Sequence, residues 1–331
     1  MVSIQRLIGS RQVTAIGFGC MNLSHAYASP PPLRDAHEVV HRALDRGVTH
    51  FDTAALYGFG RNESLMGEVL APVRSRIHLA SKCGMTGVDG RRVIDGRPQT
   101  LKATIDISLT RLRTDVIDLY YLHRCDRNVP IEDSVGAMAD MVRAGKIRAI
   151  GLSEVSAATL RRAHAVHPVC AVQSEYSLWS RNVELAVLEE TARIGASLVA
   201  FSPLARGFLA DSVDPDRFEA RDIRRTMPRF QEPHWSINVQ RLLVPFRQLA
   251  AQAGCTPAQL ALAWLLHKSV HIIPIPGTTS PAHLEENMGA LQVRLSSDQM
   301  QRIEKLIDQR TVSGARYAPG VQQEIDTEEF A

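Results

Sequence analysis

Eight short apolar runs, separated by stretches with helical periodicity, most constrain the fold that this chain can adopt. The runs cover residues 15–18, 49–52, 77–80, 116–121, 149–152, 169–172, 197–201 and 272–275. Strands that alternate with helices need crossover connections and therefore pair in parallel. Eight such units fit a (β/α)8 barrel, also called a TIM barrel, whose typical size is about 250 residues before insertions. The chain has 331 residues, so the pattern predicts an α/β fold with one such barrel and room for additional segments.

The stretches between the runs have the features of amphipathic helices. Apolar residues recur at helical spacing in 36–44, 101–112 and 131–142, and Gly47 follows the first stretch as a C-terminal cap. Thr256 and Gln259 have the spacing of a capping box, with proline at the first helical position between them. These signals predict the helices of the barrel.

The positions at which the runs end indicate where the additional segments lie. Most successive ends are one strand–helix unit apart, but 74 positions separate Phe201 from Ile275, so residues 203–233 are predicted to form a long loop after strand seven. A hairpin of residues 3–7 and 12–16 is expected to plug the barrel floor. The polar tail after Arg310 is expected either to lie over the top or to be mobile.

The same pattern predicts a single domain over residues 1–331, because the sequence has no repeat and no linker. A doubly wound sheet is the alternative fold. The segment GFGC at 17–20 lacks the third glycine of the dinucleotide-binding turn and a helix behind it, which disfavours that alternative.

Composition excludes several classes of protein. No run approaches the roughly 18 apolar residues of a membrane-spanning helix, and we expect no secretory signal at the N-terminus. The 38 Lys and Arg against 35 Asp and Glu give a formal charge of +3 without a basic patch, so no nucleic-acid partner is expected. The five cysteines form no CxxC pair, which predicts neither a disulfide framework nor a metal site and favours a cytoplasmic location.

Polar residues at the ends of the runs are the candidates for chemistry, because active sites of such barrels lie where the strands end. Lys82 closes an apolar run and is costly to bury alone, so it needs a carboxylate partner, which Asp52 can supply. A nearby cation such as Lys82 is expected to lower the pKa of Tyr57 from about 10 and make it a better proton donor. His123 can hydrogen-bond the same substrate oxygen. Each residue alone has an ordinary structural explanation, but together they suit protonation of a carbonyl oxygen when the carbonyl accepts hydride.

Six longer motifs carry a resemblance to a known family. They are FDTAALYG at 51–58, ASKCG at 80–84, DLYYLHR at 118–124, GLSE at 151–154, AFSPLARG at 200–207 and IPGTTSPAHLEEN at 275–287. In this order, and over nearly the whole chain, they resemble the aldo-keto reductases, and residues 152–181 look particularly like the perakine-reductase-like members of bacteria and plants. The resemblance implies a barrel oxidoreductase that reduces aldehydes or ketones with NADPH. On this resemblance, Tyr57 is the general acid, Lys82 paired with Asp52 tunes the acidity of Tyr57, and His123 positions the carbonyl.

The resemblance also implies the cofactor contacts. Phe201 would stack on the nicotinamide, and Ser153 and Gln173 would bind its carboxamide. The remaining implied contacts are Gly19, Met21, Asp52, Glu154, Ser202, Pro203, Leu204, Arg206, Gly207, Ile275, Gly277, Thr278, Thr279, His283, Glu286 and Asn287.

Two positions bear on the choice of cofactor. Ser280 is expected to cap a helix whose N–H groups and positive dipole end form an anion site for a 2′-phosphate. NADPH is therefore the expected cofactor. However, no Lys or Arg stands nearby, where many relatives carry one, so NADH stays open. Glu154 replaces the usual Asn, and its charge is expected to favour the oxidised nicotinamide.

The substrate and partners are less constrained. A mainly apolar mouth, suited to aromatic or medium aliphatic carbonyl compounds, is expected from Met21, Leu23, Phe59, Cys125, Trp179 and residues 218–235. Two alternatives stay open: a nicotinamide-binding regulatory or sensor protein with weak turnover, and a metal-dependent barrel hydrolase, for which no clustered ligand set is seen. The oligomeric state is not predicted.

Overall fold

Eight parallel strands form the centre of the computed structural model, which describes residues 4–24, 26–27, 29–88 and 91–330. Each strand pairs with the next along the chain: β3 (Phe18–Gly19), β4 (His50–Asp52), β5 (His78–Cys83), β8 (Leu119–Leu122), β9 (Ile150–Ser153), β10 (Val169–Glu175), β11 (Ser197–Phe201) and β12 (Ile272–Pro274). The N–H of Gly17 donates to Pro274 O at 3.0 Å and that of Gly19 to Pro276 O at 3.2 Å, so the last strand meets the first. The predicted (β/α)8 barrel is confirmed.

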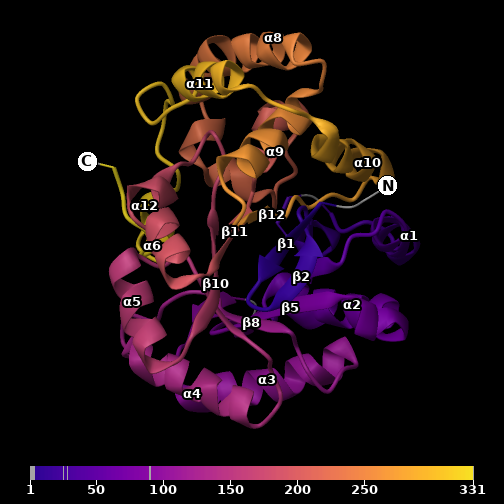
Figure 1. Cartoon of the computed structure of the whole chain (residues 1–331), viewed down its shortest axis with the longest axis vertical. Helices are drawn as coiled ribbons and strands as arrows, with labels where there is room; N and C mark the ends of the chain where they lie inside the picture. Colours follow the sequence, from indigo (N-terminus) through magenta and orange to yellow (C-terminus); the bar gives the residue numbers. More distant parts are fainter. Residues whose placement is uncertain (1–3, 25, 28, 89–90, 331) are drawn as a thin grey trace.

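Helices surround these strands (Figure 1). They are α1 (Leu33–Asp45), α2 (Arg61–Leu70), α3 (Pro98–Leu112), α4 (Ile131–Arg143), α5 (Ala157–Val166), α6 (Val187–Ile194), α9 (Pro257–Lys268) and α10 (Pro281–Gly289). The predicted apolar stripes face inward, as Val39 and Val40 of α1 show with no exposed surface. The capping box of Thr256 and Gln259 begins α9 as predicted.

A short hairpin closes the amino-terminal end of the barrel. Its strands are β1 (Gln5–Ile8) and β2 (Arg11–Thr14), joined at Gly9–Ser10. Ile8 and Val13 pack against Ala80, Tyr121 and other residues of the barrel interior. The plug is therefore confirmed, with shorter strands than predicted, while Ser3 lies outside the described residues.

The segment between β11 and α9 is longer and more ordered than the predicted loop. It contains 3-10 turns at Ala205–Ala210, Pro215–Arg217, Ile223–Thr226 and Pro228–Phe230, then α7 (His234–Asn238), a π turn (Val239–Leu243) and α8 (Val244–Gln252). Phe246 and Ala250 of α8 are buried, and this helix packs beside α11 (Ser297–Leu306) (Figure 1).

Smaller elements complete the chain. A second hairpin, β6 (Met85–Val88) with β7 (Arg91–Ile94), follows β5, and the tail contains the short helix α12 (Pro319–Gln322). The remaining 3-10 turns are Met21–Leu23, Tyr57–Gly60, Ala71–Arg76, Asn182–Leu185 and Ala290–Gln292.

No single helix among the described residues is long and apolar enough to cross a membrane. The segments His234–Gln252 and Pro257–Lys268 pass the same criterion only as a pair, with a bend of 80° between them.

Candidate active site

A cavity of about 600 Å³ opens at the carboxyl ends of the strands, where the active site was predicted. Asp52, Ser153 and Gln173 reach it from strands, and Tyr57 and His123 from the segments that follow β4 and β8. Because parallel strands end at one rim, residues far apart in sequence line one cavity.

Lys82 is the centre of a buried polar cluster beneath the cavity. Its side chain has no exposed surface, and Nζ forms an ion pair with Asp52 Oδ1. Nζ also donates to Thr53 O at 2.9 Å and to the Tyr57 hydroxyl at 3.3 Å. An isolated buried ammonium group is strongly unfavourable, so the Asp52 carboxylate is what allows a lysine here. The predicted pairing of Lys82 with Asp52 is present.

The electrostatics of Tyr57 differ from the sequence-based expectation. Burial raises the pKa of Tyr57 above 10, and the cations of Lys82 and Arg124 only reduce that increase. The prediction that Lys82 brings the pKa of Tyr57 below its ordinary value is therefore wrong, because desolvation outweighs the attraction. Burial also acts to lower the pKa of Lys82, but Asp52 and Tyr57 outweigh it and raise that pKa overall. At neutral pH the pair is thus a protonated phenol beside an ammonium group.

The His123 ring packs against the ring of Tyr57. The rings of Tyr57 and His123 meet edge to face, with their centroids 5.9 Å apart. Both side chains are about nine-tenths buried and both line the cavity. A small carbonyl group entering there would have two ring groups beside its oxygen.

Hydrogen bonds to neighbouring side chains hold Ser153 and Gln173, the two residues expected to bind a carboxamide, in place. Gln173 Nε2 donates to Asp52 Oδ2 at 2.7 Å, which ties this side chain to the Lys82 cluster. Ser153 Oγ accepts a bond of 3.0 Å from Arg124, which leaves its own O–H proton for another acceptor. Ser153 and Gln173 are partners in the β9–β10 register, so they lie side by side.

The cavity extends from this cluster to the predicted phosphate sites. The predicted residues that line it, besides those named above, are Gly19, Met21, Phe201, Ser202, Pro203, Leu204, Arg206, Gly207, Ile275, Gly277, Thr278, Thr279, His283, Glu286 and Asn287. At the far end, α10 begins with Ser280 as its cap, as predicted, and the Ser280 hydroxyl accepts from the N–H of His283 at 3.4 Å.

The turn after β11 has an unusual backbone. Ser202, Ala205 and Arg206 all have positive φ, between 47° and 56°, a region that costs a non-glycine residue about 1–2 kcal/mol. Such strain gathers at ligand sites, and successive backbone N–H groups in this conformation form anion-binding concavities. The backbone here suits a phosphate group.

Several sequence-based expectations are not met by the placement of the side chains. Glu154 does not line the cavity: its carboxylate oxygens bind Arg316, Thr327 and the N–H of Glu175 instead. The negative charge of Glu154 is therefore paired with Arg316 inside the protein and does not face the site expected for the nicotinamide. Lys82 also lies outside the lining, next to Tyr57 and Asp52, where its predicted pairing places it.

The expected substrate mouth is also corrected in part. Leu23 and Trp179 are buried in the core, with Trp179 stacked on Phe208 at 4.1 Å. Phe59 is 47% exposed outside the cavity, and Cys125 lines a separate, smaller cavity. From the expected set, Met21 and part of the 218–235 segment, including Arg224 and Met227, do line the main cavity.

Sequence reasoning missed other lining residues. The clearest is Arg124, which directly follows His123 in the DLYYLHR motif. This position next to a predicted site residue was the signal that could have identified it. Met85, Tyr317 and Val321 were missed because they come from the second hairpin and the tail, whose positions no local pattern predicts.

Comparison with known proteins identifies the family. The family model described as Aldo/keto reductase family matches residues 15–308. The chain belongs to this family. The aldo-keto reductase yakc of Schizosaccharomyces pombe, whose name specifies NADP(+), is 42% identical over 97% of this chain and 96% of its own length. Probable aldo-keto reductase 1 of Glycine max is 39% identical over 94% and 90%.

Solved aldo-keto reductase structures agree with the fold. The glycerol dehydrogenase AKR11B4 of Gluconobacter oxydans superposes with a TM-score of 0.84 and 26% identity, covering 92% of this chain and 95% of that one. Membership in this family makes the chain an oxidoreductase.

Proposed function

We propose that this aldo-keto reductase, acting as one domain, reduces aldehydes and ketones to alcohols with NADPH and with Tyr57 as proton donor. The observation that carries the proposal is the phenol of Tyr57, held 3.3 Å from a buried ammonium group and facing a cavity beside His123. The intact cluster disfavours the sensor alternative, which needs no proton donor.

The residues divide the work as follows. When bound, the reduced nicotinamide supplies the hydride, and the protein supplies position and electrostatics. Tyr57 gives its proton to the carbonyl oxygen as negative charge develops there. Lys82 stabilises the phenolate that remains, and Asp52 keeps Lys82 charged. His123 orients the carbonyl oxygen toward the phenol.

The cavity fits a dinucleotide along its length. Its lining includes Ser153 and Gln173 next to the Lys82 cluster, the strained turn at 202–207, and Thr278 and Thr279 just before α10. The N-terminus of a helix favours phosphate through its free N–H groups and its dipole. Together with the NADP(+) named for the yeast relative, this supports NADPH, bound at the 2′-phosphate by Thr278, Thr279 and His283. A kcat/KM for NADH equal to that for NADPH would contradict this preference.

The substrate side of the cavity supports a mainly apolar carbonyl compound. Leu56, Met85 and Val321 line it, and Leu56 and Met85 pack in one cluster with Tyr57. Aromatic or medium aliphatic aldehydes fit this lining.

The test is the variant Tyr57→Phe, measured with a nitrobenzaldehyde and NADPH. Loss of the general acid should reduce kcat by about 10²–10⁴-fold while leaving the Kd for NADPH within about twofold. The matched control is Tyr176→Phe, which removes a buried hydroxyl outside the cavity, bonded to Glu184. Full kcat in Tyr57→Phe would contradict the mechanism, and NADPH binding by the wild type without turnover of any carbonyl would favour the sensor.

A further inference from the structure

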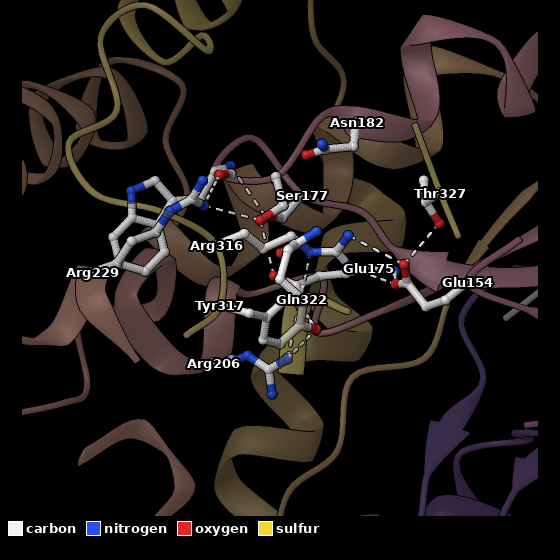
Figure 2. A network of polar contacts seen from close by, with 12 residues as sticks. Glu154, Glu175, Ser177, Asn182, Arg206, Arg229, Arg316, Tyr317, Gln322 and Thr327 are labelled. Carbon is white, nitrogen blue, oxygen red and sulfur yellow. Dashed lines mark hydrogen bonds and ion pairs between the residues drawn. The ribbon is translucent and has the colours of Figure 1, made fainter. Parts of the chain in front are cut away.

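The C-terminal tail takes part in a buried network of charges (Figure 2), and four of its residues line the cavity: Tyr317, Ala318, Val321 and Glu324. Arg316 and Tyr317 of the tail lie among Glu154, Glu175 and Arg206, which follow or end three neighbouring strands. Of the two outcomes expected from the sequence, the tail lies over the top of the barrel. It is built into the carboxyl end of the barrel.

Arg316 joins the ends of two strands. Its side chain is 3% exposed, and its guanidinium forms an ion pair with Glu154 and donates to Glu154 Oε2 at 3.2 Å. Its Nε lies 3.4 Å from Glu175 Oε2. Glu154 directly follows β9 and Glu175 is the last residue of β10, so one arginine neutralises carboxylates on adjacent strands.

The two carboxylates are directly connected to the predicted carboxamide donors. Ser153 and Gln173 form the last residue pair of the β9–β10 register. Beyond it, Glu154 N–H donates to Gln173 O at 3.0 Å, and Glu175 N–H donates to Glu154 Oε1 at 2.7 Å. The distance between the two strand ends therefore depends on where the Glu154 carboxylate is held. Arg316 holds it through an ion pair, and the Thr327 hydroxyl donates to the same carboxylate at 2.8 Å.

A second branch of the network reaches the turn after β11. Arg206 donates to Glu175 Oε2 at 2.8 Å and to the Tyr317 hydroxyl at 2.9 Å, and Arg206 and Tyr317 both line the cavity. Burial acts to raise the pKa of Glu175, but Arg206 and Arg316 outweigh it and hold that pKa well below its usual range. Glu175, Arg206 and Arg316 therefore stay charged at neutral pH.

Anchoring the tail does not by itself require this network. Asp326 accepts from Ser156 N–H at 2.8 Å, and Glu328 accepts from Ala157 N–H at 2.8 Å, both at the start of α5. Buried ion pairs add little stability compared with apolar packing of the same volume, so a buried arginine here is better explained by geometry than by stability.

We propose that Arg316 is a positioning residue for the cofactor: through Glu154 and Glu175 it holds Ser153 and Gln173 in the arrangement that binds the nicotinamide carboxamide. This inference rests on the proposed function and deepens it. It predicts that the effect of losing Arg316 is confined to the nicotinamide end of the ligand and spares the adenosine end at α10.

A series of ligands of increasing length tests this. We would measure Kd for 2′,5′-ADP, for 2′-phospho-ADP-ribose and for NADPH in the wild type and in Arg316→Met, which keeps much of the side chain and removes the guanidinium. The Kd of NADPH should rise about tenfold, the effect of losing one well-placed hydrogen bond. The Kd of 2′,5′-ADP should stay within about twofold. Arg316→Lys, which keeps the charge without the fork, should restore part of the loss.

Two controls separate positioning from anchoring. Arg310→Met removes a tail arginine that is 90% exposed and pairs with nearby Asp308, and it should change no Kd. Asp326→Ala removes an anchor without touching either carboxylate, and it should leave the ratio of the NADPH and 2′,5′-ADP constants unchanged. If Arg316→Met does not fold, Glu154→Gln removes the charge with little change of shape and carries the same expectation.

The outcomes are distinct. A rise in the NADPH constant alone supports positioning. Parallel changes for all three ligands, or no change for any, overturn the inference while leaving the proposed function standing. Failure of the wild type to bind NADPH overturns the proposed function, and this inference with it.

Discussion

At the scale of single residues, burial decides the behaviour of the proton donor. Lys82 lies 4.9 Å from the centre of the Tyr57 ring and 3.3 Å from its hydroxyl, yet the pKa of Tyr57 is raised because the phenol is buried. The sequence indicates which charges are near one another. It does not indicate how much water is removed, and here that is the larger effect.

This gives a prediction for the titration of Tyr57. A phenol whose pKa is raised stays protonated through neutral and moderately alkaline pH, so the tyrosinate absorbance of the wild type minus that of Tyr57→Phe should appear only above pH 10. The Arg124 cation lowers the pKa of Tyr57, so Arg124→Gln should move this signal to still higher pH. A difference signal that appears below pH 9 would show that the cations, and not burial, dominate.

At the scale of elements, the strands were predictable and much of what joins them was not. All eight apolar runs overlap strands, because parallel strands that are buried on both faces appear in a sequence as nearly continuous apolar runs. Helix α8 was missed, since only Phe246 and Ala250 are buried and the apolar stripe is short. For the tail, the sequence left open whether it lies over the top or is mobile, because its position depends on Arg316 meeting carboxylates more than 140 residues away in sequence, which no local pattern encodes.

The starts of β4 and β5 carry a buried pair that also escaped prediction. His50 Nδ1 lies 3.0 Å from His78 Nδ1, an arrangement in which only one ring nitrogen can donate. Burial lowers the pKa of His50, and burial with the neighbouring charges of His50, Arg11 and Arg74 lowers that of His78 well below its usual value. Both rings are therefore neutral in the folded protein.

Acid should destabilise the barrel through this pair. Below about pH 6.5 the unfolded chain binds protons that the folded pair does not, so the free energy of unfolding falls as pH falls, by up to about 1.4 kcal/mol per pH unit for each histidine. His78→Leu should reduce the slope of the unfolding midpoint against pH between about pH 7 and pH 5. His41→Gln, on the exposed face of α1, is the control and should keep the wild-type slope. Equal slopes in all three proteins would contradict this assignment.

At the scale of the whole molecule, closure of the barrel and construction of the cavity happen at the same place. The barrel is closed by hydrogen bonds from Gly17 to Pro274, the last residue of β12, and from Gly19 to Pro276 just after it. Gly19 and Gly277 at this seam both line the cavity. The seam is tight: a Cβ on Gly19 would lie 2.6 Å from Ile275 O, and one on Gly277 would lie 2.7 Å from Gly19 O. Gly277 belongs to one of the motifs that carry the family resemblance, so the sequence predicted that it contributes to the cofactor site. The sequence did not predict that Gly277 also takes part in closing the barrel.

A methyl group at the seam should therefore affect stability and binding together. In Gly19→Ala the backbone carbonyl of Ile275 must move, because contacts below 3.0 Å to backbone atoms are not tolerated, and overpacking of this kind costs about 1–3 kcal/mol. The shift also displaces Ile275 and Gly277 in the cavity wall, so the Kd for NADPH should rise in the same variant. Gly136→Ala is the matched control: it lies inside α4 with nothing within 4 Å of the added Cβ, so it should stabilise the protein by about 0.5–1 kcal/mol and leave binding unchanged. If Gly19→Ala lost stability without losing affinity for NADPH, closure and cofactor binding would be separate properties of this barrel, and the cavity would have to be formed without the seam.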